Sequence, residues 1–298
     1  MRILVTGSTG LVGSALIPAL QEKGYQVIRL VRSAADQSAE RIYWNPVEGT
    51  LNAAQLEGLD AVVHLAGESI AEGRWTAAKK ARIRESRAKG TRLLSETLAR
   101  LDRKPATLLS ASAIGFYGSR GDEVLTEQSA SGSDFLAEVC REWELSTQPA
   151  AQSGVRVVNL RFGVILSRAG GALAKMLPPF RMGVGGKLGS GKQYMSWIAL
   201  DDVVGVLEFA LVNEHLRGPV NVVAPGPVTN AEFTKMLGRV LSRPTLFPVP
   251  AFAARIAFGE MADAILLASN RVEPARLKET GYQFKYPDLE AALRHVLK

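Results

Sequence analysis

Three glycines near the start of the chain have the spacing of a phosphate-binding turn. Gly7, Gly10 and Gly13 follow the apolar run 2–6 and open a helical pattern. In such a turn one glycine makes a tight bend, one lets backbone N–H groups approach a pyrophosphate, and one packs helix on strand. The helix N-terminus adds unpaired N–H groups and partial positive charge. We therefore predict dinucleotide binding at Gly7, Thr9, Gly10, Leu11, Val12 and Gly13, against the alternative of a purely structural turn.

The end of the second strand candidate, 26–31, indicates which dinucleotide is bound. A cofactor without a 2′-phosphate is usually held by a carboxylate about 20 residues past the glycines. Here Val31 is followed by Arg32, and no carboxylate occurs before Asp36. Because a guanidinium can pair with a phosphate through two parallel hydrogen bonds, Arg32 favours NADP(H) over NAD(H). The alternative is that Arg32 merely faces solvent.

The histidines and paired carboxylates do not assemble into a further site. His64 lies inside the apolar run 61–65, so we interpret it as a core residue rather than a base. His215 and His295 occur in surface contexts, and neither a metal site nor a catalytic triad is predicted. The pair Asp201–Asp202 is typical of the first turn of a helix, where carboxylates favour the helix dipole.

Composition excludes several classes of protein. The chain has 298 residues, 36 Lys and Arg against 29 Asp and Glu, and one cysteine, Cys140, so no disulfide can form within it. No apolar run reaches the roughly 18 residues that a membrane span needs, and we expect a cytoplasmic protein without membrane contact. The net charge of +7 raises the question of nucleic acid. The basic run 79–84 has no interleaved aromatic residues, so we interpret it as a solvated helix face and expect no nucleic-acid partner.

Strand and helix patterns alternate through the first half of the chain. The expected strands are 2–6, 26–31, 41–44, 61–65, 107–112 and 155–160, and the expected helices are 11–23, 76–101 and 134–152. This alternation is typical of parallel strands joined by crossover helices. Runs such as 61–65 are apolar throughout, as expected when helices cover both faces of a sheet. The predicted fold class is α/β, with a Rossmann-type, doubly wound parallel sheet.

The second half is organised differently. The segment 167–193 has seven glycines and the pair Pro178–Pro179, so we expect it to interrupt regular structure and to line a site. Later we expect a helix over 200–213, a strand over 220–223, a helix with Asn230 as N-cap, and an amphipathic helix over 289–297. The expected domains are a cofactor-binding domain, 1–165 with a late return near 200–224, and a smaller mixed α/β C-terminal domain, 166–199 and 225–298.

Several segments carry a resemblance to a known superfamily. Thr6–Gly13, Asp60–Gly67, Gly90–Leu94 and Ser110–Gly118 resemble the extended short-chain dehydrogenases/reductases. Further segments resemble one branch of this superfamily, the epimerase family related to short-chain dehydrogenase/reductase family 39U member 1. These segments are Arg74–Trp75, Glu85–Arg87, Pro179–Gly186, Gly189–Gly191, Trp197–Ile198 and Thr229–Phe233. The resemblance covers essentially the whole chain. It implies a Rossmann domain, a small C-terminal domain over the cofactor cleft, and NADP(H) binding.

The resemblance also implies which residues contact the cofactor. Gly7–Gly13 would hold the pyrophosphate, Val31 and Arg32 would meet the adenosine ribose and its phosphate, Leu65, Ala66 and Gly67 would run beside the cofactor, and Val164, in a loop, would approach the nicotinamide side. The implied substrate is a small molecule, either a nucleotide sugar or another polar carbonyl or alcohol.

The catalytic pair of the superfamily is missing from this chain. In Tyr-xxx-Lys members the tyrosine relays a proton, and the lysine lowers the pKa of that tyrosine and holds the nicotinamide ribose. No tyrosine here has a lysine four residues later, and the two positions fall on Leu136 and Cys140. Ser112 corresponds to the family's serine, and Tyr117 is our candidate proton donor. Arg87, in place of an asparagine, is expected to bind the cofactor or an anionic substrate, unless it is simply an exposed helix arginine.

Two functions therefore stay open. Ser112 and the glycine-rich segment favour an NADP(H)-dependent oxidoreductase or nucleotide-sugar-epimerase-like enzyme. The missing Tyr-xxx-Lys pair favours a non-catalytic NADP(H)-binding regulatory or sensor protein, whose cofactor occupancy biases contact with a partner. We expect a monomer or a homodimer in either case.

Overall fold

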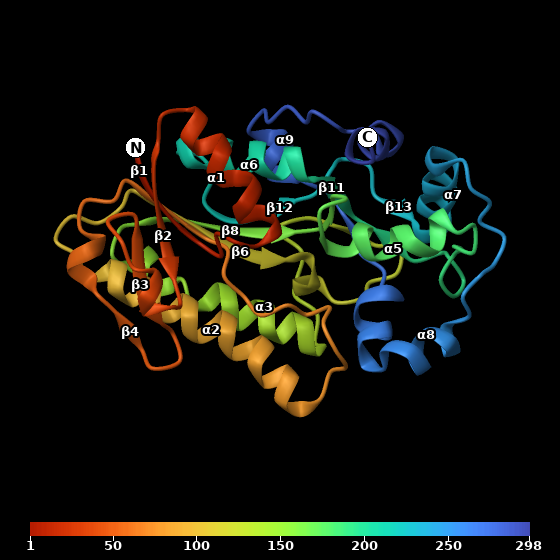
Figure 1. Ribbon diagram of the computed structural model, residues 1–298, viewed down its shortest axis with the longest axis horizontal. Coiled ribbons are helices and arrows are strands. Elements are labelled where there is room, and N and C mark those ends of the chain that lie inside the picture. The colour runs from red at the N-terminus through yellow and green to blue at the C-terminus, as the bar shows by residue number, and fades with distance from the viewer.

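Eight strands form one sheet through the middle of the molecule (Figure 1). The structure is a computed structural model and describes residues 1–298. In spatial order the strands are β12 (Gly218–Val222), β8 (Arg156–Phe162), β6 (Thr107–Ala113), β5 (Ala61–His64), β1 (Arg2–Thr6), β2 (Gln26–Val31), β3 (Arg41–Asn45) and β4 (Thr50–Leu51). Neighbouring strands are parallel except β3 and β4. The predicted α/β fold is confirmed, and the predicted strands agree with these bounds to within two residues.

The direction of winding changes between β1 and β5. From β1 the chain proceeds to β2 and β3 on one side, and from β5 it proceeds to β6, β8 and β12 on the other. Open α/β sheets bind ligands at the carboxyl ends of the strands beside such a switch point. The register pairs Thr6 with His64, so the turn after β1 and the loop after β5 are neighbours at this point.

Helices cover both faces of the sheet (Figure 1). One face carries α1 (Leu11–Glu22) and α6 (Leu200–Val212), and the other carries α2 (Ala77–Ala99), α3 (Phe135–Leu145) and α4 (Gln148–Gln152). Val63 lies in the core on the α1 side, and its neighbour Val62 lies in the core on the α2 side. Alternate residues of β5 thus enter opposite cores, which is why this strand is apolar throughout. Short turns connect some elements: η1 (Ala34–Asp36), η2 (Ala53–Leu56), η3 (Ile114–Tyr117) and η4 (Ala262–Leu266).

The single helix predicted over 134–152 was wrong, because the chain forms α3 and α4 with a break between them. Pro149 has no N–H to donate to the carbonyl four residues earlier, so a continuous helix would lose that hydrogen bond. At the break, the hydroxyl of Thr147 donates to the carbonyl of Glu144 at 2.7 Å. The position of the proline therefore decides where α3 ends.

The N-cap predicted for a later helix was also wrong. Thr229, not Asn230, precedes α7 (Asn230–Leu241), and its side chain accepts the N–H of Glu232 in a capping box. Asn230 is the first helical residue. Its side-chain oxygen accepts the N–H of Leu188 at 2.8 Å and so holds the glycine-rich segment against α7.

A smaller region packs beside the carboxyl ends of the strands. Its elements are β9 (Val164–Leu166), α5 (Gly171–Arg181), β10 (Tyr194–Met195), β11 (Trp197–Ala199), β13 (Val228–Thr229), α7, α8 (Ala251–Phe258) and α10 (Leu289–Val296). The expectation that 167–193 is irregular needs correction, because α5 forms inside it. Leu173, Leu177 and Phe180 recur at helical spacing and are buried in the core of this region, which favours the helix despite two prolines near its end.

The last part of the chain returns to the main sheet. β14 (Arg271–Val272) pairs with β7 (Val124–Leu125), and α9 (Ala275–Glu279) packs on β12. Asp202, in the first turn of α6, accepts the N–H groups of Lys285 and Tyr286. Residues 271–286 thus lie against the larger domain, within a range that we assigned to the smaller one. The longest helix, α2, has 23 residues and many charges, and no helix is long and apolar enough to cross a membrane.

Candidate functional site

The turn after β1 approaches its neighbours so closely that two positions admit only glycine. Gly7 has φ +65°, and a Cβ there would lie 2.7 Å from the carbonyl carbon of Leu65. A Cβ at Gly13 would lie 2.3 Å from the carbonyl oxygen of Gly7. Gly10 is the N-cap of α1, and both it and Thr9 are exposed. The first N–H groups of α1 are therefore available to a phosphate.

A buried histidine fixes the loop beside this turn. Thr6 Oγ1 accepts the N–H groups of Leu65 and Ala66, both at 3.1 Å, and lies 2.7 Å from Nδ1 of His64. Because both lone pairs of this hydroxyl are engaged, it donates its proton to Nδ1. The ring proton of His64 is then on Nε2 and is donated to Thr91 Oγ1 at 2.9 Å. Burial lowers the pKa of His64 to about 4, so the ring is neutral and acts as a core residue, as interpreted from the sequence.

Arg32 stands directly after β2, next to the glycine turn. β1 and β2 are in register up to Val5, which pairs with Arg29. The same register continued by two residues places Val31 beside Gly7. Val31 is half-buried, whereas Arg32 is exposed. An exposed guanidinium at this position is free to pair with an anionic group beside the turn.

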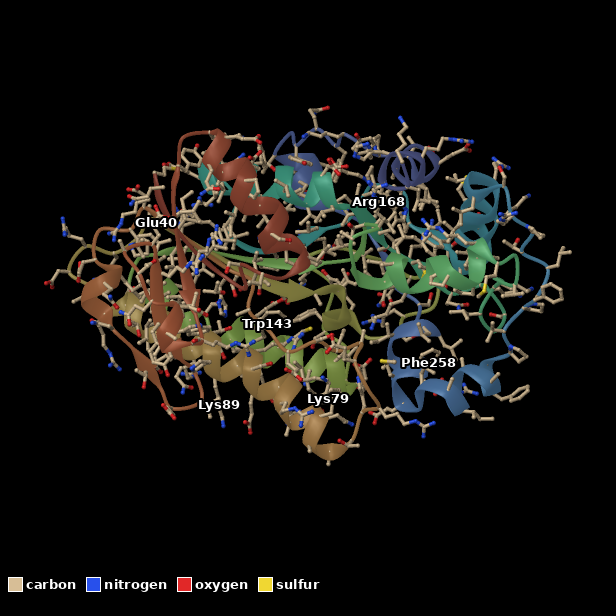
Figure 2. All side chains as sticks on the ribbon, viewed as in Figure 1. Glu40, Lys79, Lys89, Trp143, Arg168 and Phe258 are labelled. Carbon is tan, nitrogen blue, oxygen red and sulfur yellow. The ribbon has the colours of Figure 1, made fainter.

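Arg87, on α2, directs its guanidinium toward the loop after β5. A Cβ at Gly67 would lie 3.4 Å from Cζ of Arg87. The same Cζ lies 5.0 Å from the ring centre of Trp143, which Figure 2 marks on α3. Nη1 donates to the carbonyl of Ile83 at 3.1 Å, and burial lowers the pKa of Arg87. Arg87 is therefore held at the switch point and is not a freely exposed helix arginine.

The surface of α3 that faces η3 is apolar at the two positions where the superfamily has its catalytic pair. A Cβ at Gly115 would lie 3.4 Å from Cβ of Leu136 and 3.9 Å from Sγ of Cys140. Cys140 is 4% exposed, and burial together with the charge of Glu144 raises its pKa to about 12. A neutral thiol and a leucine can relay no proton at neutral pH.

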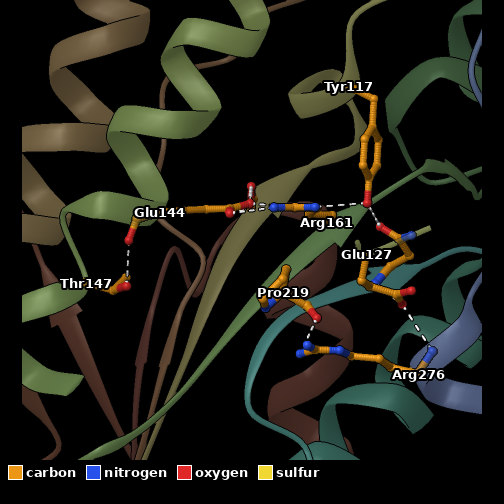
Figure 3. A network of polar contacts seen from close by, with 9 residues as sticks. Tyr117, Glu127, Glu144, Thr147, Arg161, Pro219 and Arg276 are labelled. Atoms are coloured by element: carbon orange, nitrogen blue, oxygen red, sulfur yellow. Dashed lines mark hydrogen bonds and ion pairs between the residues drawn. The ribbon is translucent and has the colours of Figure 1, made fainter. Parts of the chain in front are cut away.

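Tyr117 and Ser112 belong to a buried polar network (Figure 3). The Tyr117 hydroxyl donates to Oδ1 of Asn221 at 2.6 Å and accepts from Nη1 of Arg161 at 2.9 Å. Ser112 donates to Oε1 of Glu144 at 2.7 Å. Glu144 in turn accepts two hydrogen bonds of 2.8 Å from Arg161. The network thus joins β6, α3, β8 and β12 inside the protein.

These contacts argue against the catalytic roles that we predicted for Tyr117 and Ser112 from the sequence. Tyr117 is fully buried, and burial raises its pKa. Ser112 is 2% exposed and already donates its proton. The turn η3 carries Tyr117 back between strands instead of toward the cleft, since its ring packs with Val223 and Val272. We therefore assign Tyr117 and Ser112 to the support of the sheet.

The smaller region reaches across the glycine turn. A Cβ at Gly171, where α5 begins, would lie 3.2 Å from Cδ2 of Leu11. Further along α5, Lys175 Nζ donates to the carbonyl of Ala71 at 2.7 Å. α5 thus connects the start of α1 with the loop between β5 and α2. Val164, expected in a loop, is the first residue of β9 and pairs with β11 beside this crossing.

Most of the predicted cofactor residues lie together at the switch point. They are Gly7, Thr9, Gly10, Leu11, Val12, Gly13, Val31, Arg32, Leu65, Ala66, Gly67 and Arg87. Three further residues support the site and were not predicted: Thr6 and Thr91, which hold His64, and Lys175, which holds the loop after β5. Thr91 follows Gly90 in a segment that carried the family resemblance, and this was the only signal for it.

Two surface hollows lie away from these residues. One, of about 510 Å³, is formed by α3, α4 and the β8–β12 edge, with Phe116, Arg141 and Asn159 in its lining. The other, of about 680 Å³, lies between α2, α3 and Glu260. Neither is lined by a predicted cofactor residue, so the candidate site is the strand crevice at the switch point.

Comparison with known proteins gives the family. Residues 3–223 match the NAD dependent epimerase/dehydratase family. The chain belongs to this family. In this epimerase family protein, residues 249–296 also match a domain of unknown function, DUF1731. The epimerase family protein Mb2239 of Mycobacterium bovis is 47% identical over 294 residues, which cover 99% of this chain and 97% of that protein.

Solved structures agree with this assignment. The crystal structure of human epimerase family protein SDR39U1 (isoform 2) with NADPH has a TM-score of 0.90 and 35% identity, and the match covers 99% of each chain. UDP-glucose 4-epimerase from Thermotoga maritima has a TM-score of 0.78 at 19% identity, covering 100% of this chain and 97% of that one, and so shares the fold. The resemblance to the branch related to family 39U member 1 is confirmed.

Proposed function

We propose that this epimerase family protein binds NADP(H) at the β1–β5 switch point and is an oxidoreductase or epimerase-like enzyme. The substrate would be a small polar carbonyl or alcohol, nucleotide sugars included. The observation that carries the proposal is the position of Arg32, which is exposed directly after β2 and lies beside the glycine turn. In that turn, a Cβ at Gly7 or Gly13 would clash with neighbouring backbone atoms. The presence of NADPH in the structure of the human relative SDR39U1 supports the choice of cofactor.

The residues at the switch point fit such a cofactor. The first N–H groups of α1 would hold the pyrophosphate, and Arg32 would pair with the 2′-phosphate. Leu65, Ala66 and Gly67 would form one side of the cleft, held by Thr6. The bound nicotinamide would supply or accept a hydride.

Arg87 would hold the nicotinamide half of the cofactor. Its guanidinium has five N–H donors, and one of its nitrogens is bonded to the carbonyl of Ile83. The remaining donors lie next to Gly67, on the cleft side of α2. A fixed cation here would bind the nicotinamide ribose, as the lysine of the Tyr-xxx-Lys pair does in the superfamily. Cys140, which stands at the position of that lysine, cannot do so.

A second candidate function is a non-catalytic NADP(H) sensor. The observation that favours it is the absence of a proton relay at Leu136 and Cys140, together with the engagement of Tyr117 in its buried network. In this function, cofactor occupancy would act on the smaller region through α5, because Lys175 of α5 is bonded to the loop that lines the cleft.

A single-turnover assay separates the two functions. The protein is loaded with NADPH and offered a panel of sugar nucleotides, aldehydes and ketones, while the absorbance of the reduced nicotinamide is followed. For an enzyme we expect oxidation with at least one carbonyl, slowed by Arg87→Met and retained by Cys140→Ala. NADPH that stays reduced with every compound, in a protein that binds it, would favour the sensor.

A further inference from the structure

One end of the smaller region carries a concentration of exposed apolar side chains. We call six of them the apolar tip: Met182, Val184, Leu246, Phe247, Phe252 and Ile256. They come from the loop after α5, the loop before α8, and α8 itself. Single exposed apolar residues are ordinary. Six that gather from two segments form a patch of the kind that mediates contact with another surface.

The two segments lie side by side at the right-hand end of the molecule in Figure 1. The N–H of Gly189 donates to the carbonyl of Val249 at 2.8 Å, and the N–H of Val249 donates to the carbonyl of Lys187 at 2.9 Å. A Cβ at Gly186 would lie 1.9 Å from the carbonyl oxygen of Phe247. These backbone contacts hold the loop after α5 and the loop before α8 together at this end of the smaller region.

The helix α8 is apolar but is scarcely packed against the rest of the chain. Seven of its eight residues are Ala, Phe or Ile, and Ala254 alone is buried. Phe252 and Ile256 lie one turn apart on the same side and are 64% and 70% exposed. Phe258, at the end of the helix, is marked in Figure 2 and is also exposed. A helix of this composition normally faces a protein core or an apolar medium.

The segments of the tip are rich in positive charge, and the nearest carboxylates, Glu260 and Asp263, follow directly after α8. Between residues 168 and 200 the charged residues are Arg168, Lys175, Arg181, Lys187 and Lys192, and between 233 and 259 they are Lys235, Arg239, Arg243 and Arg255. Arg255 and Arg239 are paired with Asp263 and Glu290, whereas Lys187 and Arg243 are exposed and form no ion pair, so an anionic surface would complement the tip. A second copy of the chain docked through the same patch would bring these cations face to face, which disfavours self-association here.

We propose that the apolar tip docks on an anionic lipid bilayer. Phe247, Phe252 and Ile256 would enter the boundary between headgroups and acyl chains, while Lys187 and Arg243 would contact anionic headgroups. The tip consists of two loops and a short helix at one end of the molecule. A broad lipid surface can contact all of these elements at the same time. Such docking needs no spanning helix, so it revises our expectation of no membrane contact.

Vesicle co-sedimentation tests the proposal. The full chain is mixed with phosphatidylcholine vesicles that contain or lack phosphatidylglycerol. We expect binding only where phosphatidylglycerol is present, and weaker binding at higher salt. Two double variants, Phe252→Ser with Ile256→Ser and Lys187→Glu with Arg243→Glu, should each lower the partition coefficient by about tenfold or more. The matched controls Val47→Ser and Arg100→Glu, exposed positions outside the tip, should bind as the wild type does.

Three outcomes would overturn the proposal. The first is no binding to phosphatidylglycerol vesicles, and the second is equal binding by the wild type and both double variants. The third is that the wild type is a dimer by light scattering without lipid, whereas the variant with Phe252→Ser and Ile256→Ser is a monomer. That result would make the tip a self-association surface. The melting temperature and its rise on adding NADPH, measured for every variant, show whether each one is folded.

Discussion

The guanidinium of Arg87 lies against the backbone of Gly67, with Cζ 3.4 Å from where a Cβ of residue 67 would be. Four residues after Arg87 on the same helix, Thr91 accepts the ring proton of His64. One helix, α2, therefore both supplies a cation to the cleft and fixes the loop that forms its wall. The proposed cofactor site thus depends on α2 as much as on the glycine turn.

Replacing Arg87 should weaken cofactor binding. Arg87→Met keeps a side chain of similar length but removes the charge-assisted hydrogen bonds, each of which contributes about 1.5–3 kcal/mol. The dissociation constant for NADPH, measured by fluorescence titration, should rise about tenfold or more. Arg92→Met, an exposed position on the same helix, should leave it unchanged. If a folded Arg87→Met protein binds NADPH with unchanged affinity, Arg87 does not contact the cofactor, and its role is to pack on Trp143.

Arg32 should determine the choice between the two nicotinamide dinucleotides. Arg32→Ala removes the partner of the 2′-phosphate, so the affinity for NADP should fall about tenfold or more while that for NAD stays the same. Calorimetric titration with each dinucleotide measures both values. Arg41→Ala, an exposed arginine at the start of β3, is the matched control. A wild-type protein that binds NAD as tightly as NADP would contradict the assignment.

Buried His64 should make stability depend on pH. Its pKa is lowered from 6.5 to about 4 by burial, so below pH 6.5 the unfolded chain binds a proton that the folded protein does not. Stability should therefore fall as pH decreases from 6.5 toward 4, by up to about 1.4 kcal/mol per pH unit. None of the side chains that contact the ring, Thr6, Thr91 and Trp44, titrates.

Urea unfolding between pH 7.5 and 5 measures this dependence, since most carboxylates titrate at lower pH. His64→Asn should flatten the slope of stability against pH in this window. His215→Asn, at an exposed position, should keep it. The same slope in wild type and His64→Asn would show that another group is responsible.

Tyr117 should matter for stability and not for chemistry. Tyr117→Phe leaves Oδ1 of Asn221 and Nη1 of Arg161 without their partner inside the protein, which costs about 1–3 kcal/mol of unfolding free energy. Urea denaturation should detect this loss, and NADPH affinity should not change. Tyr25→Phe removes a hydroxyl that makes no comparable buried bond and serves as the control. A stable Tyr117→Phe protein that lost turnover would restore the tyrosine as proton donor.

Features that depend on neighbouring residues were predictable from the sequence. The strand patterns predicted the sheet, and the spacing of Gly7, Gly10 and Gly13 predicted the turn, because both follow from residues a few positions apart. The break before Pro149 was predictable for the same reason, since a proline two residues after Thr147 is a local signal. The capping box at Thr229 also lies within four residues.

Features that depend on distant residues were not predictable. Tyr117 had the right position for a cleft, but its partner Asn221 is 104 residues away and draws it into the interior. Lys175 and Ala71 are also 104 residues apart, so no local pattern indicates that α5 crosses the cleft. The apolar tip likewise exists only because 182–189 pairs with the segment before α8.

The position of β12 in the sequence, far after its partner β8, has a consequence for synthesis of the chain. β12 pairs with β8 at the edge of the sheet, yet between them the chain must make β9, α5, β10, β11 and α6. A nascent chain of about 165 residues would therefore expose the edge of β8, and unpaired edges invite aggregation. Residues up to 222 must leave the ribosome before that edge is covered. The part of the chain up to β8 is therefore not expected to be stable without the residues that follow it. A gene truncated after about residue 165 should yield insoluble protein.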